Sequence, residues 1–340
     1  MSLNLAFFGL QQKPFNPTPD PSFLYPSPGH REGLAQLVYG VQEHKGFILL
    51  TGEVGTGKTT LLRALLSRLD GNTASAFVFD TTLPFEGLVE YILEDFGVAK
   101  PGESHAQRLI ALNNFLIERR RAGQNTVLVL DEAQNLDVRA LEQIRLLSNF
   151  ESATEKLLQI LLVGQPELLD KLDRPDLRQL KQRISLRCRI VPLTAGQTRD
   201  YIRTRLRIAG ATDLGLFSDA AITRIFEYSG GIPRLINTLC DHCLLIGYAD
   251  QIRRIDRAIV EEAIAYFEEG ARRPRKPRRR LRHTWGRALG RWALPAAGAA
   301  LIGGVAALAI AYRDALRQVI GLSTAALSGL AHAASTFFRP

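Results

Sequence analysis

The sequence predicts an α/β domain built on a parallel sheet, then a small all-helical domain and an apolar segment near the C-terminus. Between residues 47 and 164, short runs of branched apolar residues alternate with longer helical patterns, as in sheets that carry helices on both faces. Beyond Pro192 the strand-like runs stop and only helical patterns follow. With 340 residues, 46% of them hydrophobic, the chain is long enough for two or three folded units.

The predicted strands are short and free of polar interruptions, which is typical of strands buried on both faces. Four such runs are Phe47–Thr51, Ala76–Asp80, Thr126–Asp131 and Leu158–Gly164, and Ile184–Ile190 is a fifth candidate. The helices predicted around them are Gly33–Val41, Lys58–Leu69, Phe85–Phe96, Ser104–Arg121 and Val138–Phe150. The first 30 residues are too rich in proline for a long helix, so we expect them to lie extended against the domain.

The α/β domain is assigned to residues 1–192 and the all-helical domain to residues 193–270. The helices predicted in the second domain are Gln197–Ile208, Asp219–Tyr228, Pro233–Tyr248 and Asp256–Glu269. A chain break at Gly230-Gly231-Ile232-Pro233 separates the second of these from the third. The whole chain has three cysteines, too few for a disulfide framework, so we expect a reduced, cytoplasmic domain.

The net charge of +9 comes from the C-terminal part of the chain. Residues 1–271 are close to neutral, whereas residues 272–340 contain thirteen basic residues and one acidic residue. A basic linker at 271–292 precedes the apolar stretch 293–311, which is about long enough to cross a bilayer. Because basic residues beside a span stay on the cytoplasmic side, we expect a transmembrane helix at 293–311 with the folded domains in the cytoplasm. The alternative is a buried or interfacial helix.

A short tail at 312–340 follows this predicted span. It contains a second apolar run, Val319–Phe338, which is interrupted by His332 and several hydroxyl residues. The run is either a second span or an amphipathic surface helix, and the sequence leaves both open.

A phosphate-binding loop follows the first predicted strand and opens a predicted helix, the context that confirms the pattern G-x4-G-K-[ST]. The residues of this loop are Gly52, Glu53, Val54, Gly55, Thr56, Gly57, Lys58 and Thr59. Its glycines let backbone N–H groups face an anion. We expect Lys58 to reach the β- and γ-phosphates of ATP, the Thr59 hydroxyl to ligate Mg²⁺, and Thr60 to contact the α-phosphate.

The third predicted strand ends in two carboxylates, Asp131 and Glu132. Downstream of a phosphate-binding loop, this pair predicts that Asp131 holds Mg²⁺, directly or through water, and that Glu132 acts as general base on the attacking water. The spacing leaves room for another strand between the two motifs, so their strands need not be neighbours. ATP is favoured over GTP because the sequence has no [NT]-K-x-D motif to read guanine.

Three more residues are candidates for completing this site. Gln165 follows the fourth strand and is either a γ-phosphate sensor or a helix-start residue. Arg183, with Arg178 in reserve, lies in a basic turn and is either an arginine finger for a neighbouring subunit or part of a solvated face. Arg234 opens the helix after the Gly-Gly-Ile-Pro break, so we expect it to bring a cation from the helical domain over the phosphates.

Other conspicuous residues are expected to be structural. Cys240 and Cys243 share a helix face and lack a second ligand pair, so we expect buried thiols rather than a metal site. The N-terminal aromatic residues, such as Phe15, are expected to pack rather than to stack on bases. His30 is a candidate for contact with adenine, from its place before the Gly33–Val41 helix alone.

These motifs together resemble the AAA+ ATPases of the general secretion pathway protein A (ExeA-like) family, over roughly residues 5–267. The resemblance is carried by Phe8-Gly9-Leu10, Pro14-Phe15, Phe23-Leu24-Tyr25, the phosphate-binding loop, Leu130–Leu136 and Val163–Leu168. It implies a P-loop AAA+ core, an all-helical lid domain and a single span after it. It also implies a nucleotide-dependent homo-oligomer in the inner membrane whose ATP hydrolysis serves an envelope-spanning machine for secretion, pili or exopolysaccharide.

One departure from that family affects the expected partners. Such proteins often carry a periplasmic domain that binds peptidoglycan, whereas only residues 312–340 follow the predicted span here. We therefore expect a periplasmic or membrane partner protein to supply that function. The competing hypothesis is an AAA+ regulator of DNA transposition or replication, but the near-neutral ATPase region makes nucleic acid an unlikely partner.

Overall fold

The computed structural model describes residues 3–269, apart from residues 17, 19, 24, 70, 99–101, 103 and 152–154. The described residues all fall within one unit, Met1–Arg272. The basic linker at 271–292, the predicted span at 293–311 and the tail at 312–340 lie outside the described residues. Among those that are described, no helix is both long and apolar enough to cross a bilayer.

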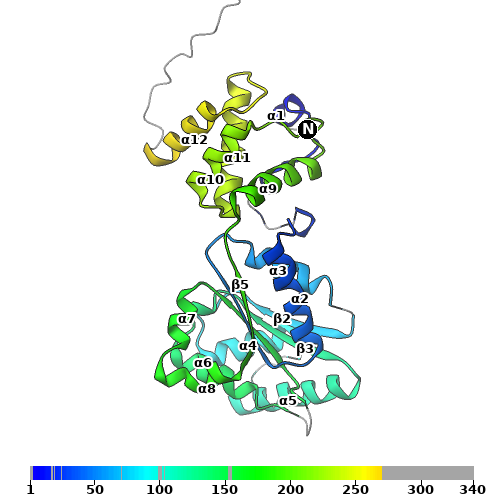
Figure 1. The fold of residues 1–340 in the computed structure, drawn as a ribbon. Helices are drawn as coiled ribbons and strands as arrows, with labels where there is room; N and C mark the ends of the chain where they lie inside the picture. The colour runs from blue at the N-terminus through cyan, green and yellow to red at the C-terminus, as the bar shows by residue number, and fades with distance from the viewer. Residues whose placement is uncertain are drawn as a thin grey trace, which may run out of the picture. The chain divides into compact units, whose positions relative to one another are not determined.

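A five-stranded parallel sheet forms the centre of the α/β part (Figure 1). Its strands are β1 (Phe47–Gly52), β2 (Thr73–Val78), β3 (Asn125–Leu130), β4 (Gln159–Gly164) and β5 (Ile184–Ile190). The order across the sheet is β2-β3-β4-β1-β5, with every neighbouring pair parallel. The predicted parallel sheet is confirmed. In the sheet, β4 lies between β1, which precedes the phosphate-binding loop, and β3, which precedes Asp131 and Glu132. Strand β2, which lies between β1 and β3 in sequence, is at the edge of the sheet.

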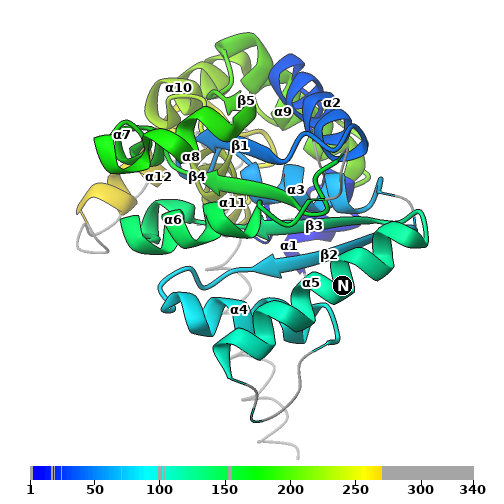
Figure 2. The same cartoon turned by 90° about the horizontal axis from the view of Figure 1, so that it is seen from below.

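Alternate residues of the strands face two separate apolar cores, as expected of strands buried on both sides. The first core contains Leu128 and Leu162, and the second contains Val129 and Val163. The helices on the first side are α4 (Phe85–Asp95), α5 (His105–Arg121), α6 (Val138–Leu147), α7 (Glu167–Leu172) and α8 (Arg178–Arg183). On the second side lie α2 (Pro28–Gln42) and α3 (Lys58–Leu66). Figures 1 and 2 show α2 and α3 together, away from α6, α7 and α8.

Several element boundaries differ from the predicted ones for local reasons. Strand β2 ends at Val78 rather than Asp80, because the Asp80 carboxylate accepts hydrogen bonds from the backbone and hydroxyl of Thr82 and starts a turn. Helices α3 and α6 end three residues early, at Leu66 and Leu147, and a serine follows each of them, Ser67 and Ser148. In each case the serine hydroxyl donates to the carbonyl three residues before it. The short helix α7 was not predicted.

A helical bundle follows the sheet and shares its core with the N-terminal segment. Its helices are α9 (Ala195–Ile208), α10 (Asp219–Ser229), α11 (Pro233–Ala249) and α12 (Arg257–Glu269), with the short α1 (Leu3–Phe7) and the 3₁₀ turn η1 (Pro21–Phe23) packed nearby. Phe15 is fully buried, with its ring edge-on to Phe217 at 5.8 Å between centroids. Cys240 and Cys243 are likewise buried in this core. The predicted packing roles of the N-terminal aromatic residues and of the two thiols are confirmed.

A close backbone approach at Gly231 joins the bundle to the end of the sheet. The N–H of Leu193 donates to the Gly231 carbonyl at 2.9 Å, and the N–H of Arg234 donates to the Gly55 carbonyl at 3.1 Å. Gly231 has φ +77°, and a Cβ on it would lie 1.9 Å from the Leu193 carbonyl oxygen. Glycine alone suits both the conformation and the spacing.

We expect Gly231→Ala to lower the free energy of unfolding by about 2–5 kcal/mol, because it adds left-handed strain and a backbone clash. Gly230→Ala is the matched control. Its φ is +58° and its Cβ would meet no atom within 4 Å, so only the conformational cost of about 1–2 kcal/mol applies. Denaturant unfolding of the two variants measures the difference. Equal losses would show that the junction relaxes around the added methyl group.

Candidate functional site

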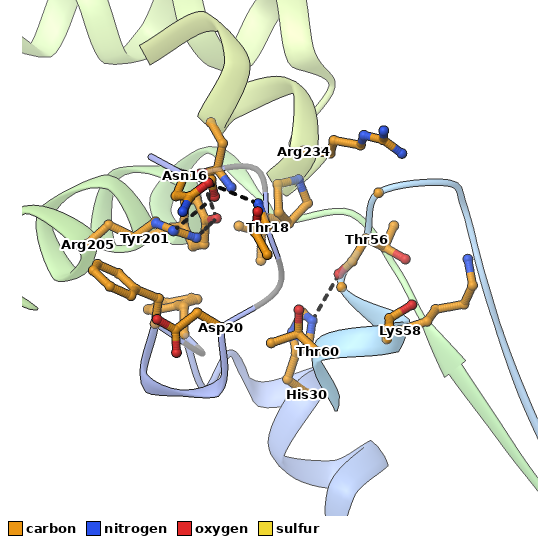
Figure 3. A pocket seen from close by; sticks show the side chains of 18 of the residues that line it. Asn16, Thr18, Asp20, His30, Thr56, Lys58, Thr60, Tyr201, Arg205 and Arg234 are labelled. Carbon is orange, nitrogen blue, oxygen red and sulfur yellow. Dashed lines mark hydrogen bonds between the residues drawn. The ribbon is translucent and has the colours of Figure 1, made fainter. Parts of the chain in front are cut away.

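A cavity of about 280 Å³ lies beside the loop between β1 and α3 (Figure 3). Four parts of the chain line most of it: residues 54–60 of the loop, the N-terminal segment with the start of α2, Glu132 after β3, and helices α9 and α11 of the bundle. Figure 3 shows Lys58 and Arg205 at opposite sides of it. The cavity therefore joins the predicted phosphate-binding loop to Tyr201, Arg205 and Asn237 of the bundle, which the sequence analysis did not include.

Two glycines give the phosphate-binding loop its shape. Gly55 and Gly57 have φ of +79° and +101°, conformations that L side chains rarely adopt. A Cβ on Gly55 would lie 2.6 Å from the Cβ of Arg234, so the helical bundle packs directly on the loop. The loop leads into α3, whose first N–H groups have no partner within the helix and suit an anion.

Lys58 is only 6% exposed at the start of α3. Its ammonium donates to the carbonyl oxygens of Gly52 at 2.8 Å and Glu53 at 3.1 Å. Burial lowers the pKa of Lys58, while the nearby carboxylates of Glu132 and Asp131 act in the opposite direction. Lys58 is thus a buried cation at the end of the cavity formed by the loop.

The predicted magnesium ligands lie together. The Thr59 hydroxyl donates to the Asp131 carboxylate at 3.2 Å. Asp131 is 5% exposed, and burial raises its pKa against the opposing hydrogen bond from the backbone of Glu132. A hydroxyl and a carboxylate are the hard oxygen donors that Mg²⁺ prefers, so the two residues fit that ion.

The carboxylate of Glu132 lines the cavity and is held by two amides. Its Oε2 accepts from Gln134 Nε2 at 2.6 Å and from Gln165 Nε2 at 3.2 Å. Burial raises the pKa of Glu132, but these hydrogen bonds and the charge of Lys58 outweigh it, so the pKa lies below its usual value. Gln165 thus touches the predicted base. Gln134 was missed by the sequence analysis, although it stands only two residues beyond Glu132.

His30 braces the phosphate-binding loop. Its Nε2 lies 3.0 Å from the Thr56 carbonyl oxygen and its Nδ1 lies 2.7 Å from the Ser27 hydroxyl. Because a carbonyl only accepts, Nε2 carries the proton and Nδ1 accepts from Ser27. Burial lowers the pKa of His30, which favours this neutral form. His30 also lines the cavity, and its contact with adenine stays a prediction.

The three predicted arginines lie in different places. Arg234 lines the cavity, and its side chain runs past Gly55 of the loop. Arg183 is distant from the cavity, and its NH1 group donates to Ser148 Oγ at 2.6 Å and Asn149 Oδ1 at 2.7 Å. Arg178 is exposed, and its side chain makes no hydrogen bond or ion pair within the described part of the chain.

A buried polar network closes the end of the cavity opposite Lys58 (Figure 3). Arg205, 6% exposed, donates to the Pro14 carbonyl at 2.5 Å and to the Tyr201 hydroxyl at 2.9 Å, and the latter donates to Asn237 Oδ1 at 2.8 Å. Its guanidinium also lies over the Phe23 ring, 4.7 Å from the centroid. Arg205 and Tyr201 lie one turn apart on α9, but Pro14, Phe23 and Asn237 are far from them in sequence, so no local pattern predicts the network.

The sequence matches an AAA domain over residues 41–172. It is 42% identical over 267 residues to general secretion pathway protein A from Aeromonas hydrophila, which covers 78% of this chain and 48% of that relative. It is also 30% identical over 142 residues to an uncharacterized HTH-type transcriptional regulator from Methanocaldococcus jannaschii, covering 41% of this chain and 34% of the regulator. The chain thus spans about half the length of the first relative and a third of the second.

Solved structures with a similar fold include the Aeropyrum pernix ORC2 protein in ADPNP and ADP complexes, with a TM-score of 0.60 at 18% identity over 76% of this chain and 73% of that one. Cdc6p from Pyrobaculum aerophilum has a TM-score of 0.55 at 21% identity, over 72% of this chain and 70% of its own. At such identities these likenesses show the fold alone. The chain therefore contains an AAA domain and is similar, over 267 residues, to general secretion pathway protein A.

Proposed function

We propose that the chain hydrolyses ATP with Lys58 on the β- and γ-phosphates and Glu132 as the general base. The observation that carries this proposal is the meeting of both side chains at one cavity. Gln165, which contacts Glu132, is placed to report the γ-phosphate to the base. Arg234 brings a cation of the bundle to the loop, and residues 52–60 wrap the phosphates with backbone N–H groups.

Thr59 and Asp131 are the residues that would hold Mg²⁺ in this site, where the ion would neutralise charge on the β- and γ-phosphates. Burial of Asp131 supports this assignment, because a buried carboxylate is stabilised by a bound cation. Thr59 and Lys58 come from the first turn of α3, so one helix start orients both the metal ligand and the phosphate-binding cation.

We propose that Arg183 acts on the nucleotide of a neighbouring subunit. It directly precedes β5, whose first residue pairs with Phe47 at the start of β1, whereas the phosphate-binding loop follows the other end of β1. Six strand residues separate those ends by about 20 Å, too far for a single arginine to span. Arg183 therefore either acts on the nucleotide of another chain or stabilises the C-terminal end of α6, where it donates to Arg145 O and Ser148 Oγ.

We further propose that this ATPase is anchored in the inner membrane, with its folded domains in the cytoplasm, and serves the assembly of an envelope machine for secretion. The name of the Aeromonas relative, general secretion pathway protein A, supports the pathway. The sequence of residues 271–311 supports the anchor, since a basic linker precedes an apolar stretch. A homo-oligomer and a periplasmic or membrane partner complete the proposal.

Sealed vesicles of both orientations test the anchor. We expect the full chain to sediment with membranes and to hydrolyse ATP only when nucleotide reaches the cytoplasmic face, while the variant that lacks residues 271–340 hydrolyses ATP in solution. Turnover of the full chain in the soluble fraction would contradict the anchor. In the source cells, we expect Glu132→Gln to leave the secretion machine unassembled. Salt-sensitive DNA binding by residues 1–271 would instead support the transposition or replication hypothesis.

A further inference from the structure

We propose that Gln134 is a positioning residue for ATP hydrolysis, which holds Glu132 by one carboxylate oxygen and leaves the other to take the proton of the attacking water. The inference rests on the proposed role of Glu132 as general base. It adds a residue from the turn after β3 that lies within the Leu130–Leu136 motif and to which the sequence analysis gave no role.

The two amides that reach Glu132 bind the same atom. Gln134 Nε2 and Gln165 Nε2 both donate to Oε2, at 2.6 Å and 3.2 Å, and within the described residues Oε1 receives no donor from the protein. A carboxylate held by one oxygen is fixed in direction, and its second oxygen keeps its lone pairs for a proton. Because Glu132 lines the cavity, this arrangement suits a base that acts on water beside the γ-phosphate.

The amide of Gln134 is itself fixed in orientation. Its Oε1 accepts from the backbone N–H of Gln165 at 3.1 Å, which identifies Nε2 as the end that faces Glu132. A Cβ on Gly164 would lie 2.8 Å from that same Oε1, so the glycine at the end of β4 makes room for the amide. Lys171 of α7 donates to the carbonyl oxygens of Gln134 and Leu136 and holds the turn in place.

The backbone at Glu132 is also constrained. Glu132 has φ +51° and ψ +38°, a left-handed conformation that is unfavourable for a residue with a side chain. The buried Thr81 hydroxyl donates to the Glu132 carbonyl at 2.9 Å. A strained backbone conformation of this kind persists only where surrounding contacts hold it, and such conformations are common at functional sites. Thr81 thus holds the backbone of Glu132, and Gln134 holds the side chain.

The fixed direction of the carboxylate gives this role a measurable consequence. Without the Gln134 amide, Glu132 keeps only the 3.2 Å hydrogen bond from Gln165, so its carboxylate is less firmly directed at the attacking water, while the contacts of the loop with the nucleotide are untouched. Such a change lowers kcat and leaves KM for ATP nearly unchanged. A residue that only supports the fold would instead lower the amount of active protein and its resistance to unfolding.

The decisive variant is Gln134→Met, which has a similar length and removes the amide without adding a charge. We expect kcat to fall about tenfold to a hundredfold, with KM for ATP nearly unchanged. Gln134→Glu, which keeps an acceptor for the Gln165 N–H but replaces the donor by a carboxylate, should lower kcat at least as much. The matched control is Gln36→Met, which removes an amide-to-carboxylate hydrogen bond of 3.0 Å to Glu32 on the exposed face of α2 and should behave as wild type.

Steady-state hydrolysis by the full chain across a range of ATP concentrations, with ATP binding and thermal unfolding measured in parallel, separates the outcomes. A wild-type kcat in Gln134→Met, with Glu132→Gln inactive, would overturn the positioning role alone. If Glu132→Gln kept wild-type turnover, the assignment of the base would be wrong instead. A Gln134→Met protein that binds ATP and unfolds as wild type but has the lowered kcat supports the inference.

Discussion

Replacing Lys58 by alanine should reduce ATP turnover by roughly 10²–10³-fold, because the site then loses the cation that meets the charge developing on the transferred phosphoryl group. The effect should be large since the ammonium is already in place, buried and held by the carbonyls of Gly52 and Glu53. Lys156→Ala is the matched control, because Lys156 pairs with Glu151 on the exposed surface and such pairs contribute little. Its turnover should match wild type.

The Lys58→Ala variant also tests whether each ATP site is completed by an arginine from the neighbouring subunit. We expect Arg183→Ala to be inactive alone, and mixtures of Lys58→Ala with Arg183→Ala to recover part of the turnover, because some interfaces then pair an intact Lys58 with an intact Arg183. Turnover per subunit should rise across a dilution series as oligomers form. If mixing restores nothing and turnover is independent of concentration, Arg183 serves its own chain by binding Ser148 and Asn149.

Replacing Glu132 by glutamine should reduce kcat by about 10²–10⁴-fold while ATP binding is retained, because the variant cannot accept a proton from water. The substitution keeps the size of the side chain and leaves Lys58 and Thr59 untouched. Nucleotide should therefore remain bound, and we expect the protein to accumulate as an ATP-bound oligomer.

Size-exclusion chromatography with ATP, beside single-turnover hydrolysis, measures both effects of Glu132→Gln. Glu227→Gln is the control, since Glu227 belongs to an exposed ion-pair cluster on the bundle with Arg224 and Arg257. Equal turnover in Glu132→Gln and wild type would remove Glu132 from the mechanism. An inability to bind ATP would show that the carboxylate supports the loop rather than the chemistry.

The parts of the site that the sequence predicts best are those formed by adjacent residues. The segment from Gly52 to Thr60 carries its chemistry within one turn between a strand and a helix, so its spacing alone defines the geometry. Asp131 and Glu132 follow from the end of a strand in the same way. The buried strands were equally easy to predict, because a strand that is covered on both faces appears in the sequence as an uninterrupted apolar run.

The residues that escaped prediction depend on contacts between distant parts of the chain. Arg205 bonds the carbonyl of Pro14, 191 positions away, and nothing in the surrounding helical pattern distinguishes it from a surface arginine. Gln134 is close to Glu132 in sequence, but the direction of its amide depends on Gly164 at the end of the neighbouring strand β4 and on Gln165 directly after it. Serine hydroxyls at the ends of α3 and α6 shortened those helices below what apolar periodicity predicted.

The buried guanidinium of Arg205 also bears on the release of spent nucleotide. Arg205 donates hydrogen bonds to both Pro14 and Tyr201, and so connects the N-terminal segment, which forms one wall of the cavity, to the helical bundle. The wall and the bundle should consequently separate from the phosphate-binding loop as one piece when ADP departs. Exchange of ADP for ATP would then proceed at the rate of that opening, and any protein that holds the bundle against the loop would slow the cycle without touching the reacting atoms.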